Sequence, residues 1–455
     1  MANKTILTTQ AKTVQEETLY LSPVAVLPTS LQIPIGTIYC FLSKVDPWAD
    51  DENPEQPTGD TSYIKQTFKN MFVAKKITTS DIAAVIPRVN WSANTVYDYY
   101  TDTADMTALD ENNNLVYNFY VKNKYDQVFK CLWNNNGGPS TFEPFFEPGS
   151  YNTNNIYQNS DGYKWKYIYT IDTGLKIKFM DNTWMPIIIG ANTPNPIQST
   201  AGVGSIDVIN VTNGGSGYDP SNAAISITVD GDGSGFSATA NVVSGVVKDV
   251  VVTNPGSNYS YANVSITSTI GSGATAISPT SPVGGHGFDP ISELGCRHIM
   301  LVSQFEGSEN DLIPTDNDYH QVGLIVNPTT YESPGYPANA AIYRTTTDLI
   351  VSPGFGTYSG DEYVFQGTTL ENSTFSARVL SFDTATNLLY LINTRGNLSL
   401  NSPVVGETSK TTRTLLSYNT SNFVPFSGYL IFIENRAAVQ RSADGIEQFR
   451  FVLGF

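Results

Sequence analysis

The stretch DGYKWKYIYTI, residues 161–171, indicates the fold class of this chain more directly than any other segment. After an Asp-Gly turn, aromatic side chains alternate with lysine, isoleucine and threonine. Successive side chains of a strand point to opposite faces of a sheet, so this alternation predicts a strand. One face would carry Tyr163, Trp165, Tyr167 and Tyr169, and the other Lys164, Lys166, Ile168 and Thr170. An aromatic ladder of this kind can bind sugars or stacked bases, but a packed sheet face is its more common cause.

The composition of the whole chain also favours a large β protein. Its 455 residues correspond to about three domains at roughly 150 residues each. Charged residues make up only 15% of the chain and aromatic residues 12%, which excludes an intrinsically disordered protein. The 36 glycines and 25 prolines are typical of strands and turns rather than of long helices.

The charge balance narrows the classes of partner. Lys+Arg number 25 and Asp+Glu 42, which gives a net charge of −17. A nucleic-acid binder needs a basic face, and an anionic membrane surface would repel this chain, so we expect neither partner. No run of about 18 apolar residues is present that could span a bilayer.

The cysteines and the N-terminal residues indicate the compartment. The three cysteines, Cys40, Cys131 and Cys296, are odd in number and widely spaced, unlike those of a disulfide-stapled secreted scaffold. Residues 1–18 contain no apolar core of signal-peptide length. We therefore expect the protein to be made and to fold in the cytoplasm, with its thiols reduced.

The clearest helical signals lie between residues 62 and 86. Ile64, Phe68, Met71 and Phe72 recur at the spacing of one helix face. Ser80 is expected to cap a second short helix over residues 81–86, which would end before a proline. Most other segments show strand patterns. Alternation over residues 116–133 predicts a pair of strands, and alternation over 357–416 predicts a compact meander or small barrel.

One part of the chain is duplicated. Residues 206–218 read IDVINVTNGGSGY and residues 247–259 read VKDVVVTNPGSNY, a spacing of 41. Each repeat predicts a strand, a Gly-rich turn, a second strand, a Gly-Ser turn and a third strand. Neither repeat could bury much apolar surface by itself, so we expect the two to pack together as one small β domain. Residues 192–204 are expected to form a linker that leads into it.

These patterns predict a mainly β chain with a few short helices, built from β-sandwich or small-barrel domains plus the repeat insert. We expect an N-terminal, mostly β domain over residues 1–200 and an inserted tandem-repeat domain over 201–280. A return segment over 281–356 would pack on the N-terminal part, and a C-terminal β domain would cover 357–455.

No sequence motif requires catalysis or a cofactor. His286, His298 and His320 lie near Cys296, but a zinc site needs four ligands in closely spaced pairs, and only one such pair exists. Residues 230–235, DGDGSG, copy half of an EF-hand loop, yet Asn241 stands where the bidentate glutamate belongs, which favours a Gly-rich turn. We expect a non-enzymatic protein without catalytic, cofactor-binding or metal-binding residues. Carboxylate pairs for glycoside cleavage stay open, because their spacing is spatial rather than sequential.

Four groups of segments resemble the baseplate wedge subunit encoded by gene eight in T-even-like contractile-tailed bacteriophages. They are 70–91 (NMFVAKKITTSDIAAVIPRVNW) with 97–100 (YDYY); 128–137 (VFKCLWNNNG) with 161–171 and 184–186 (WMP); 282–295 (PVGGHGFDPISELG); and 428–441 (GYLIFIENRAAVQR) with Glu447. Their order and spacing cover about residues 20–190 and 282–455. The Gly-rich segment between them has no counterpart in the basic wedge subunit. It is similar to Gly-Ser-Gly-Tyr repeat modules in structural proteins of marine and cyanobacterial phages.

The resemblance implies a β-rich structural protein of the virion, located in the tail baseplate and assembled in the host bacterial cytoplasm. It implies a homodimer that contacts other wedge subunits, of the gene six, seven and ten kinds, with no enzymatic role and no cofactor. The low charge and the 26 tyrosines suit interface cores, and the charge of −17 would keep free subunits apart. Two other classes stay open. One is a host-surface glycan-binding tail adhesin that uses Tyr163, Trp165, Tyr167 and the insert, and the other is a depolymerase.

Overall fold

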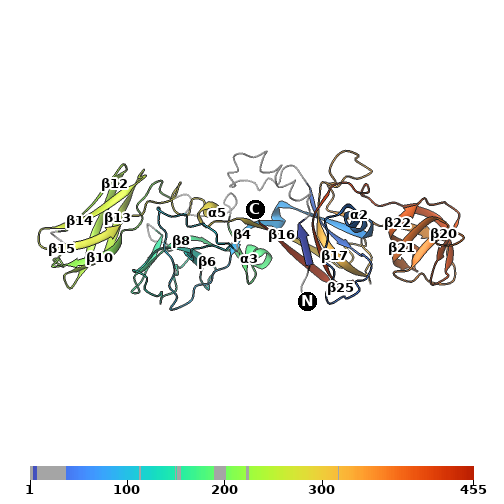
Figure 1. Cartoon of the computed structure of the whole chain (residues 1–455), viewed down its shortest axis with the longest axis horizontal. Coiled ribbons are helices and arrows are strands. Elements are labelled where there is room, and N and C mark those ends of the chain that lie inside the picture. The colour runs from blue at the N-terminus through green and yellow to red at the C-terminus, as the bar shows by residue number, and fades with distance from the viewer. Residues whose placement is uncertain are drawn as a thin grey trace. The chain divides into compact units, whose positions relative to one another are not determined.

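The computed structural model describes residues 4–7, 37–111, 114–148, 150, 155–188, 201–221, 225–315 and 317–454. Within these residues the chain is mainly β with a few short helices, arranged in several sheets and one closed barrel (Figure 1). This architecture confirms the expected fold class. Most of the expected linker, residues 192–200, lies outside the described residues.

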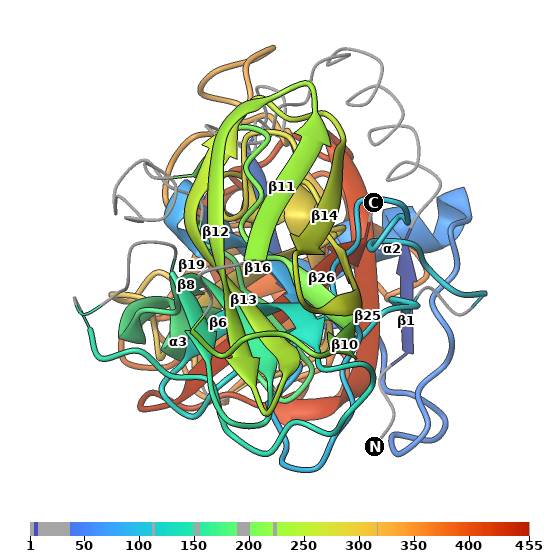
Figure 2. The same ribbon diagram turned by 90° about the vertical axis from the view of Figure 1, so that its left-hand side faces the viewer.

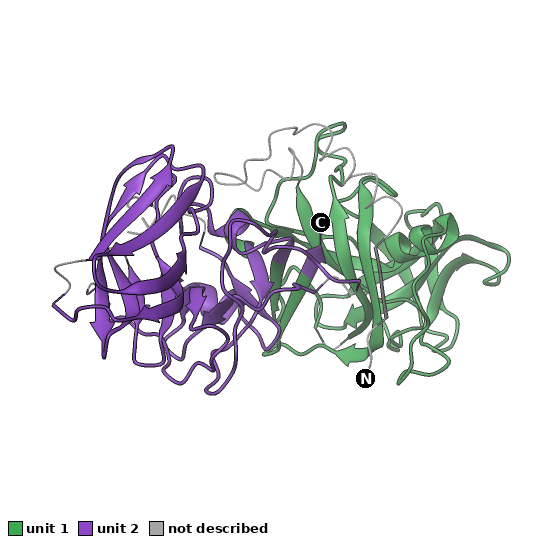
Figure 3. Ribbon diagram, turned by 60° about the vertical axis from the view of Figure 1, so that its left-hand side comes forward, with its two compact units in different colours: residues 1–25, 32–82, 301–451 green, residues 26–31, 83–300, 452–455 purple. Residues whose placement is uncertain are grey.

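The backbone clusters into two compact units (Figure 3). Unit 1 comprises residues 1–25, 32–82 and 301–451, and unit 2 comprises residues 26–31, 83–300 and 452–455. These two units are defined differently from the four segments expected from the sequence. The boundaries of those four segments remain a prediction.

Unit 1 contains a six-stranded sheet with the order β1-β25-β17-β2-β3-β18. Its strands are β1 Lys4–Leu7, β2 Ile38–Ser43, β3 Met71–Ile77, β17 Asp318–Val326, β18 Ile342–Arg344 and β25 Tyr429–Gln440. β2 lies between β17 and β3, and every one of its residues is buried, as its nearly unbroken apolar sequence requires. Tyr39 and Phe41 of β2 contribute to the core of this sheet.

Unit 1 also contains the closed barrel, with the strand order β19-β22-β21-β20-β23-β24 (Figure 1). Its strands are β19 Thr347–Val351, β20 Tyr363–Gly367, β21 Ser373–Asp383, β22 Leu388–Gly396, β23 Pro403–Gly406 and β24 Thr412–Asn419. Alternate apolar side chains of these strands fill the barrel interior, among them Val364, Leu389 and Leu391. β16 His298–Glu306 and β26 Ile446–Gly454 are neighbours in a further sheet.

The helix expected from residue 62 onward is shorter than its sequence pattern. α2 Thr61–Asn70 is a helix, and the carboxylate of Asp60 caps its N-terminus by accepting a hydrogen bond from the Tyr63 amide. The next residues form strand β3, so Met71 and Phe72 do not extend the helix face. The apolar spacing of the four side chains therefore extends two residues beyond the end of the helix, because Met71 and Phe72 are buried by their strand positions in the sheet instead.

The second helix expected over residues 81–86 is wrong. Ser80 lies in the single 3-10 turn Thr79–Asp81, and the chain continues as strand β4 Ile82–Pro87. β4 pairs in antiparallel fashion with β9 Trp184–Pro186, which lies about a hundred residues away in the sequence. β-branched residues in β4 favour a strand when such a partner is available, and a local pattern contains no information about that partner.

Unit 2 contains a four-stranded sheet with the order β5-β6-β8-β7. Its strands are β5 Tyr120–Lys122, β6 Gln127–Asn134, β7 Ile156–Gln158 and β8 Tyr163–Thr170. All residues of β6 are buried, and β8 is buried except at its last residue. Two short helices, α3 Thr173–Phe179 and α5 Pro290–Glu293, are capped by Asp172 and Asp289.

The repeat insert in unit 2 consists of six strands that pair two by two (Figure 2). The strands are β10 Asn210–Ser216, β11 Ile225–Gly231, β12 Ser234–Val243, β13 Val246–Ser257, β14 Ala262–Ser268 and β15 Ser272–Ile277. β10 pairs with β15, β11 with β14 and β12 with β13. Each pair joins one strand of the first repeat to one strand of the second, so each repeat completes the other.

The registers of these pairs repeat when the two repeats are exchanged. Ser216 lies opposite Ser272, and Ser257, its equivalent in the second repeat, lies opposite Ser234. Equivalent glycines adopt equal left-handed conformations, with φ of +61° at Gly215 and +62° at Gly256. The insert therefore has an internal pseudo-twofold symmetry that follows from its sequence duplication.

Candidate functional site

The histidines considered from the sequence have separate structural roles. The ring of His298 packs on Trp184, with 4.5 Å between ring centroids. The Nδ1 atom of His320 lies 2.8 Å from the Val45 carbonyl, and its Nε2 atom lies 3.3 Å from Asp318. His286 belongs to a buried ionic cluster with Lys130 and Glu293. Within the described residues, no group of three or more His, Cys, Asp or Glu side chains has the arrangement of a metal site.

The half EF-hand sequence forms the turn between β11 and β12. The Asp232 carboxylate accepts hydrogen bonds from the Ser260 amide at 2.8 Å and from the Ser260 hydroxyl at 2.5 Å. Asn241 lies in β12 opposite Asp249. The carboxylate of Asp232 thus connects two turns of the insert, as the Gly-rich turn interpretation predicts.

The aromatic face of β8 is a packed core. Tyr163 and Trp165 are fully buried and Tyr167 is 3% exposed. Tyr163 stacks on Trp165 with 5.5 Å between centroids, and Tyr97 meets Trp165 edge-on at 5.3 Å. The exposed aromatic ladder that motivated the adhesin interpretation is therefore absent, and the more common explanation of this ladder is correct.

The opposite side of the same sheet carries three buried lysines, which form the most unusual constellation of the described structure. Lys164 and Lys166 lie on β8, and Lys130 lies on β6 directly opposite Lys166. The three lysine side chains are only 4%, 7% and 1% exposed in the order 164, 166 and 130. Two like charges facing each other across a strand pair repel, so each ammonium needs its own counter-charge.

Two of these lysines hold the insert. The Lys166 ammonium lies 2.7 Å from Asp207, a residue just before β10. The Lys164 ammonium lies 2.9 Å from Asp249 on β13 and donates a hydrogen bond to the Ile209 carbonyl at 2.7 Å. The first repeat and the second repeat are therefore each connected to the sheet by one ion pair.

Lys130 holds the segment that returns from the insert. Its ammonium lies 2.8 Å from Glu293 of α5 and 3.8 Å above the ring of Tyr100. His286 shares the same Glu293 oxygen at 2.9 Å, and the Gly287 amide donates to the other oxygen at 2.6 Å. The entry, the body and the exit of the insert are thus all attached to one sheet face.

The protonation states in this cluster follow from burial and charge. Burial would raise the pKa of the Glu293 carboxyl, but the Lys130 ammonium and the His286 hydrogen bond outweigh it and lower the pKa to about 2. Burial and the nearby Lys130 charge both lower the pKa of His286, so the imidazole is neutral. For Asp207, burial alone would raise the pKa, yet the Lys166 charge lowers it overall.

The cluster has the properties of an anchor rather than those of an acid-base site. Both oxygens of Glu293 are occupied by protein donors, and Asp207 accepts from Lys166 and from the Ser205 hydroxyl at 2.7 Å. A general acid or base must have an atom available to the substrate. Removing one partner of such a buried pair costs about 3–5 kcal/mol, because it leaves an uncompensated charge.

The alternation of residues 161–171 predicts that Lys164 and Lys166 share one strand face but indicates no role for them. One signal was available: three lysines on buried strands of a chain with only 15% charged residues are unusual. Their partners Asp207, Asp249 and Glu293 could not be found, since they lie between 41 and 163 residues away in the sequence.

A comparable anchor lies in unit 1. Arg378 on β21 of the barrel is 2% exposed and lies 2.9 Å from Asp46 and 2.8 Å from Asp361. It also donates to the carbonyl of Lys44, which directly follows β2, at 3.3 Å. The Lys44 ammonium in turn pairs with Asp361 and Asp318. This network connects the barrel to the six-stranded sheet.

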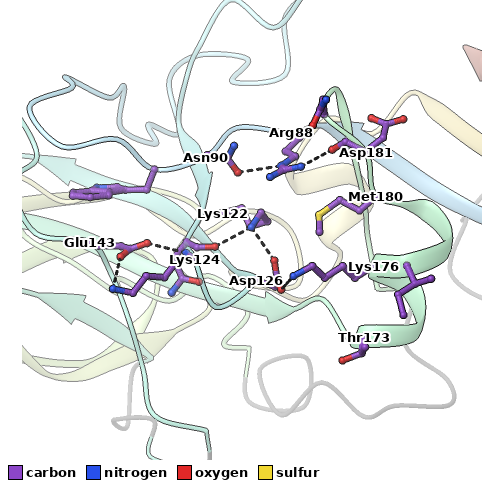
Figure 4. Close-up of a pocket in the computed structure, with 14 residues that line it drawn as sticks. Arg88, Asn90, Lys122, Lys124, Asp126, Glu143, Thr173, Lys176, Met180 and Asp181 are labelled. Carbon is purple, nitrogen blue, oxygen red and sulfur yellow. Dashed lines mark hydrogen bonds and ion pairs between the residues drawn. The ribbon is translucent and has the colours of Figure 1, made fainter.

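Unit 2 also has a cavity of about 840 Å³ beside the four-stranded sheet (Figure 4). Residues from β5, from the β5–β6 turn, from α3 and from the chain around residue 90 line it. Its charged lining residues are Arg88, Lys122, Lys124, Lys176, Asp126, Glu143 and Asp181. This concentration of cations stands out in a chain whose net charge is −17.

Every helix in the described part of the chain is too short or too polar to cross a bilayer. No protein-family model matches the chain, and no curated protein matches it.

Proposed function

We propose that this protein is a structural subunit of the baseplate wedge in a contractile-tailed phage. It acts through homodimerisation and through contacts with other wedge proteins, not through catalysis. Segments 70–91, 128–137, 282–295 and 428–441 support the proposal through their resemblance to the gene-eight type of wedge subunit. The mainly β architecture is compatible with it.

One structural observation carries most of the proposal: the buried charges connect elements to each other. Lys130, Lys164 and Lys166 attach the insert and its return segment to a sheet, and Arg378 attaches the barrel to another sheet. A protein that transmits force between neighbours needs its parts held rigidly, and paired buried charges hold them in one geometry. Chemistry would instead need at least one of these groups to face a substrate.

The first test is the oligomeric state of the purified chain. We expect light scattering after size-exclusion chromatography to give twice the chain mass of 49.6 kDa at micromolar concentration. We also expect co-expression with the other wedge proteins of the same phage to yield a stable complex. A chain that stays monomeric and never co-purifies with tail components contradicts the proposal.

The glycan-binding adhesin is the competing outcome. Its aromatic motif at Tyr163, Trp165 and Tyr167 is buried, so only the insert could still support it. Whole-cell or glycan-array binding that disappears when residues 205–278 are deleted would favour an adhesin over a wedge subunit. Release of reducing sugar from host polysaccharide would favour a depolymerase.

A further inference from the structure

We propose that the basic cavity of unit 2 binds an acidic polypeptide segment, with Arg88 as the residue that receives its carboxylate. The proposal deepens the proposed function and rests on it only for the identity of the partner, which would be another wedge protein.

The cations of the cavity are incompletely neutralised. Asp126 is shared by two lysines, with its oxygens 2.8 Å from the Lys122 ammonium and 2.6 Å from the Lys176 ammonium (Figure 4). Lys124 has its own partner, Glu143, at 3.4 Å. Four cations and three carboxylates in the lining leave a local charge of +1. The rest of the chain is strongly acidic, so this site is where a negative group is attracted rather than repelled.

Arg88 provides the unused donors. Its Nε donates to the Asn90 amide oxygen at 3.1 Å, and one terminal nitrogen donates to the Asp181 carbonyl at 2.7 Å. No carboxylate of the described residues forms an ion pair with it. Three of the five N–H groups of a guanidinium therefore remain, in the planar arrangement that binds a carboxylate with two parallel hydrogen bonds. The Asp181 carboxylate forms no ion pair with Arg88; its Oδ1 atom accepts hydrogen bonds from the amides of Thr183 and Trp184, each at 2.7 Å.

The lining favours a peptide carboxylate over phosphate and over a sugar. Phosphate would meet the charges but has no apolar part to contact Ile177 and Met180, which also line the cavity. A sugar ring would need an open aromatic platform, but Trp91 packs against the aromatic core and donates its indole N–H to Ser140 at 3.0 Å. Ile177, which is 70% exposed, and Met180 line the cavity beside the charges and suit the apolar side chains of a polypeptide.

The test measures binding of a fluorescein-labelled eight-residue peptide of alternating glutamate and leucine to the full-length protein by fluorescence anisotropy. The control peptide carries glutamine in place of glutamate. We expect only the glutamate peptide to bind, with an affinity that falls as sodium chloride is raised from about 50 to 300 mM, because exposed ion pairs are screened.

Three variants locate the site. Losing one charge-assisted pair should weaken binding about tenfold in Arg88→Gln, and Lys176→Gln should weaken it by a smaller factor. Lys176 is exposed, so its variant still tests the site if Arg88→Gln proves unstable. The matched control is Arg395→Gln, an exposed arginine of the barrel strand β22, which should leave the affinity unchanged.

Several outcomes would overturn the proposal. They are equal binding of the glutamine peptide, unchanged affinity in both cavity variants, and displacement of the peptide by inorganic phosphate at constant ionic strength. Binding of alginate without binding of the peptide would assign the cavity to acidic glycans instead. The dimer mass of Arg88→Gln should equal that of the wild type, so failure of the peptide site is distinguishable from failure of the wedge proposal.

Discussion

The insert and the barrel are both six-stranded β structures, but they achieve their stability differently. In the barrel, each strand pairs with two neighbours and the sheet closes on itself around a fully buried core. In the insert, strands pair two by two across the repeats, and most of its apolar side chains, such as Ile227 and Val229, are only partly buried. Closure of the barrel removes free strand edges and excludes water from its core. Duplication in the insert instead produces a module that needs both repeats.

The two modules also differ in how they are attached. The insert is anchored at its entry, body and exit by three lysines of one sheet. The barrel is anchored by the guanidinium of Arg378 with its partners, and by an ion pair of 2.6 Å between Arg344 of β18 and Asp348 of β19. From this comparison we infer that the insert, whose apolar side chains are mostly only partly buried, depends on strong anchors. The barrel, whose core is fully buried, is stable by itself.

The largest effect is expected from Asp207→Asn, which leaves the Lys166 ammonium buried without its carboxylate. We expect a loss of about 3–5 kcal/mol in the stability of the insert and its attachment. Hydrogen exchange of the β10 and β13 amides would measure it. The control is Asp249→Asn, which should lower the stability clearly less. Asp249 is 17% exposed, and Lys164 keeps its hydrogen bond to the Ile209 carbonyl in this variant. Equal effects of the two variants would contradict the anchor model.

Next in size is Leu391→Ala in the barrel, where the removed side chain is fully buried. A cavity in a closed core costs about 2–5 kcal/mol, so we expect the barrel amides to exchange much faster. Val229→Ala in the insert removes a partly buried side chain and should cost less than half as much. If Leu391→Ala and Val229→Ala lower the free energy of unfolding equally, the contrast between a fully buried barrel core and a partly buried insert core is wrong.

A third prediction tests the pseudo-twofold symmetry of the insert. A Cβ at Gly215 would lie 2.4 Å from the Ser272 carbonyl oxygen, and a Cβ at Gly256 would lie 2.7 Å from the Ser234 carbonyl oxygen. Both glycines have left-handed φ values, so alanine should cost about 1–2 kcal/mol for the conformation alone at either position. Protease sensitivity of the insert should rise equally in the two variants.

Gly360→Ala is the matched control for the glycine variants. No heavy atom outside its chain neighbours lies within 4 Å of the Cβ that it would acquire, so we expect no change in protease sensitivity. A strong rise in protease sensitivity at only one of the two insert glycines would show that the two repeats do not contribute equally to the stability of the insert.

The smallest effect is a pH response of opposite sign in the two units. Burial and Lys130 lower the pKa of His286 in unit 2, so its contribution is present above the unfolded pKa of about 6.5 and is lost as the pH falls. Glu293, with its pKa lowered to about 2, adds to the loss at pH values below about 4.5. Unit 2, which carries the insert, should therefore be destabilised by acid.

His320 in unit 1, which carries the barrel, should respond in the other direction. Burial alone would lower its pKa, but the hydrogen bonds to Asp318 and to the Val45 carbonyl raise it overall. Its stabilisation is present below about pH 6.5 and is lost as the pH rises through the folded-state pKa. Hydrogen exchange of each unit at pH 5.5 and pH 7.5, compared with the variants His320→Gln and His286→Gln, measures both signs. Parallel responses in the two units would contradict the assignment.

Sequence reasoning reached the β class, the helix that begins near residue 62 and the turn at Asp232, and it failed where a distant partner decides. Residues 82–87 have a spacing that suits a short helix, yet pairing with β9 makes them a strand. The packed aromatic face of β8 was predictable from alternation, but the acidic partners of Lys164 and Lys166 on the other face were not. The basic cavity was also missed, because Arg88, Lys122 and Lys176 are scattered along the chain.

By itself, the sequence determined the features that depend on neighbouring residues: alternation specifies strands, and glycines with positive φ specify the turns of the repeats. It also determined that the two repeats need each other, because neither has enough apolar surface. Only the tertiary structure decided which strands pair across the repeats and which carboxylates neutralise the buried lysines. Those choices depend on contacts between residues far apart in the chain, where pairing, burial and charge are settled together rather than locally.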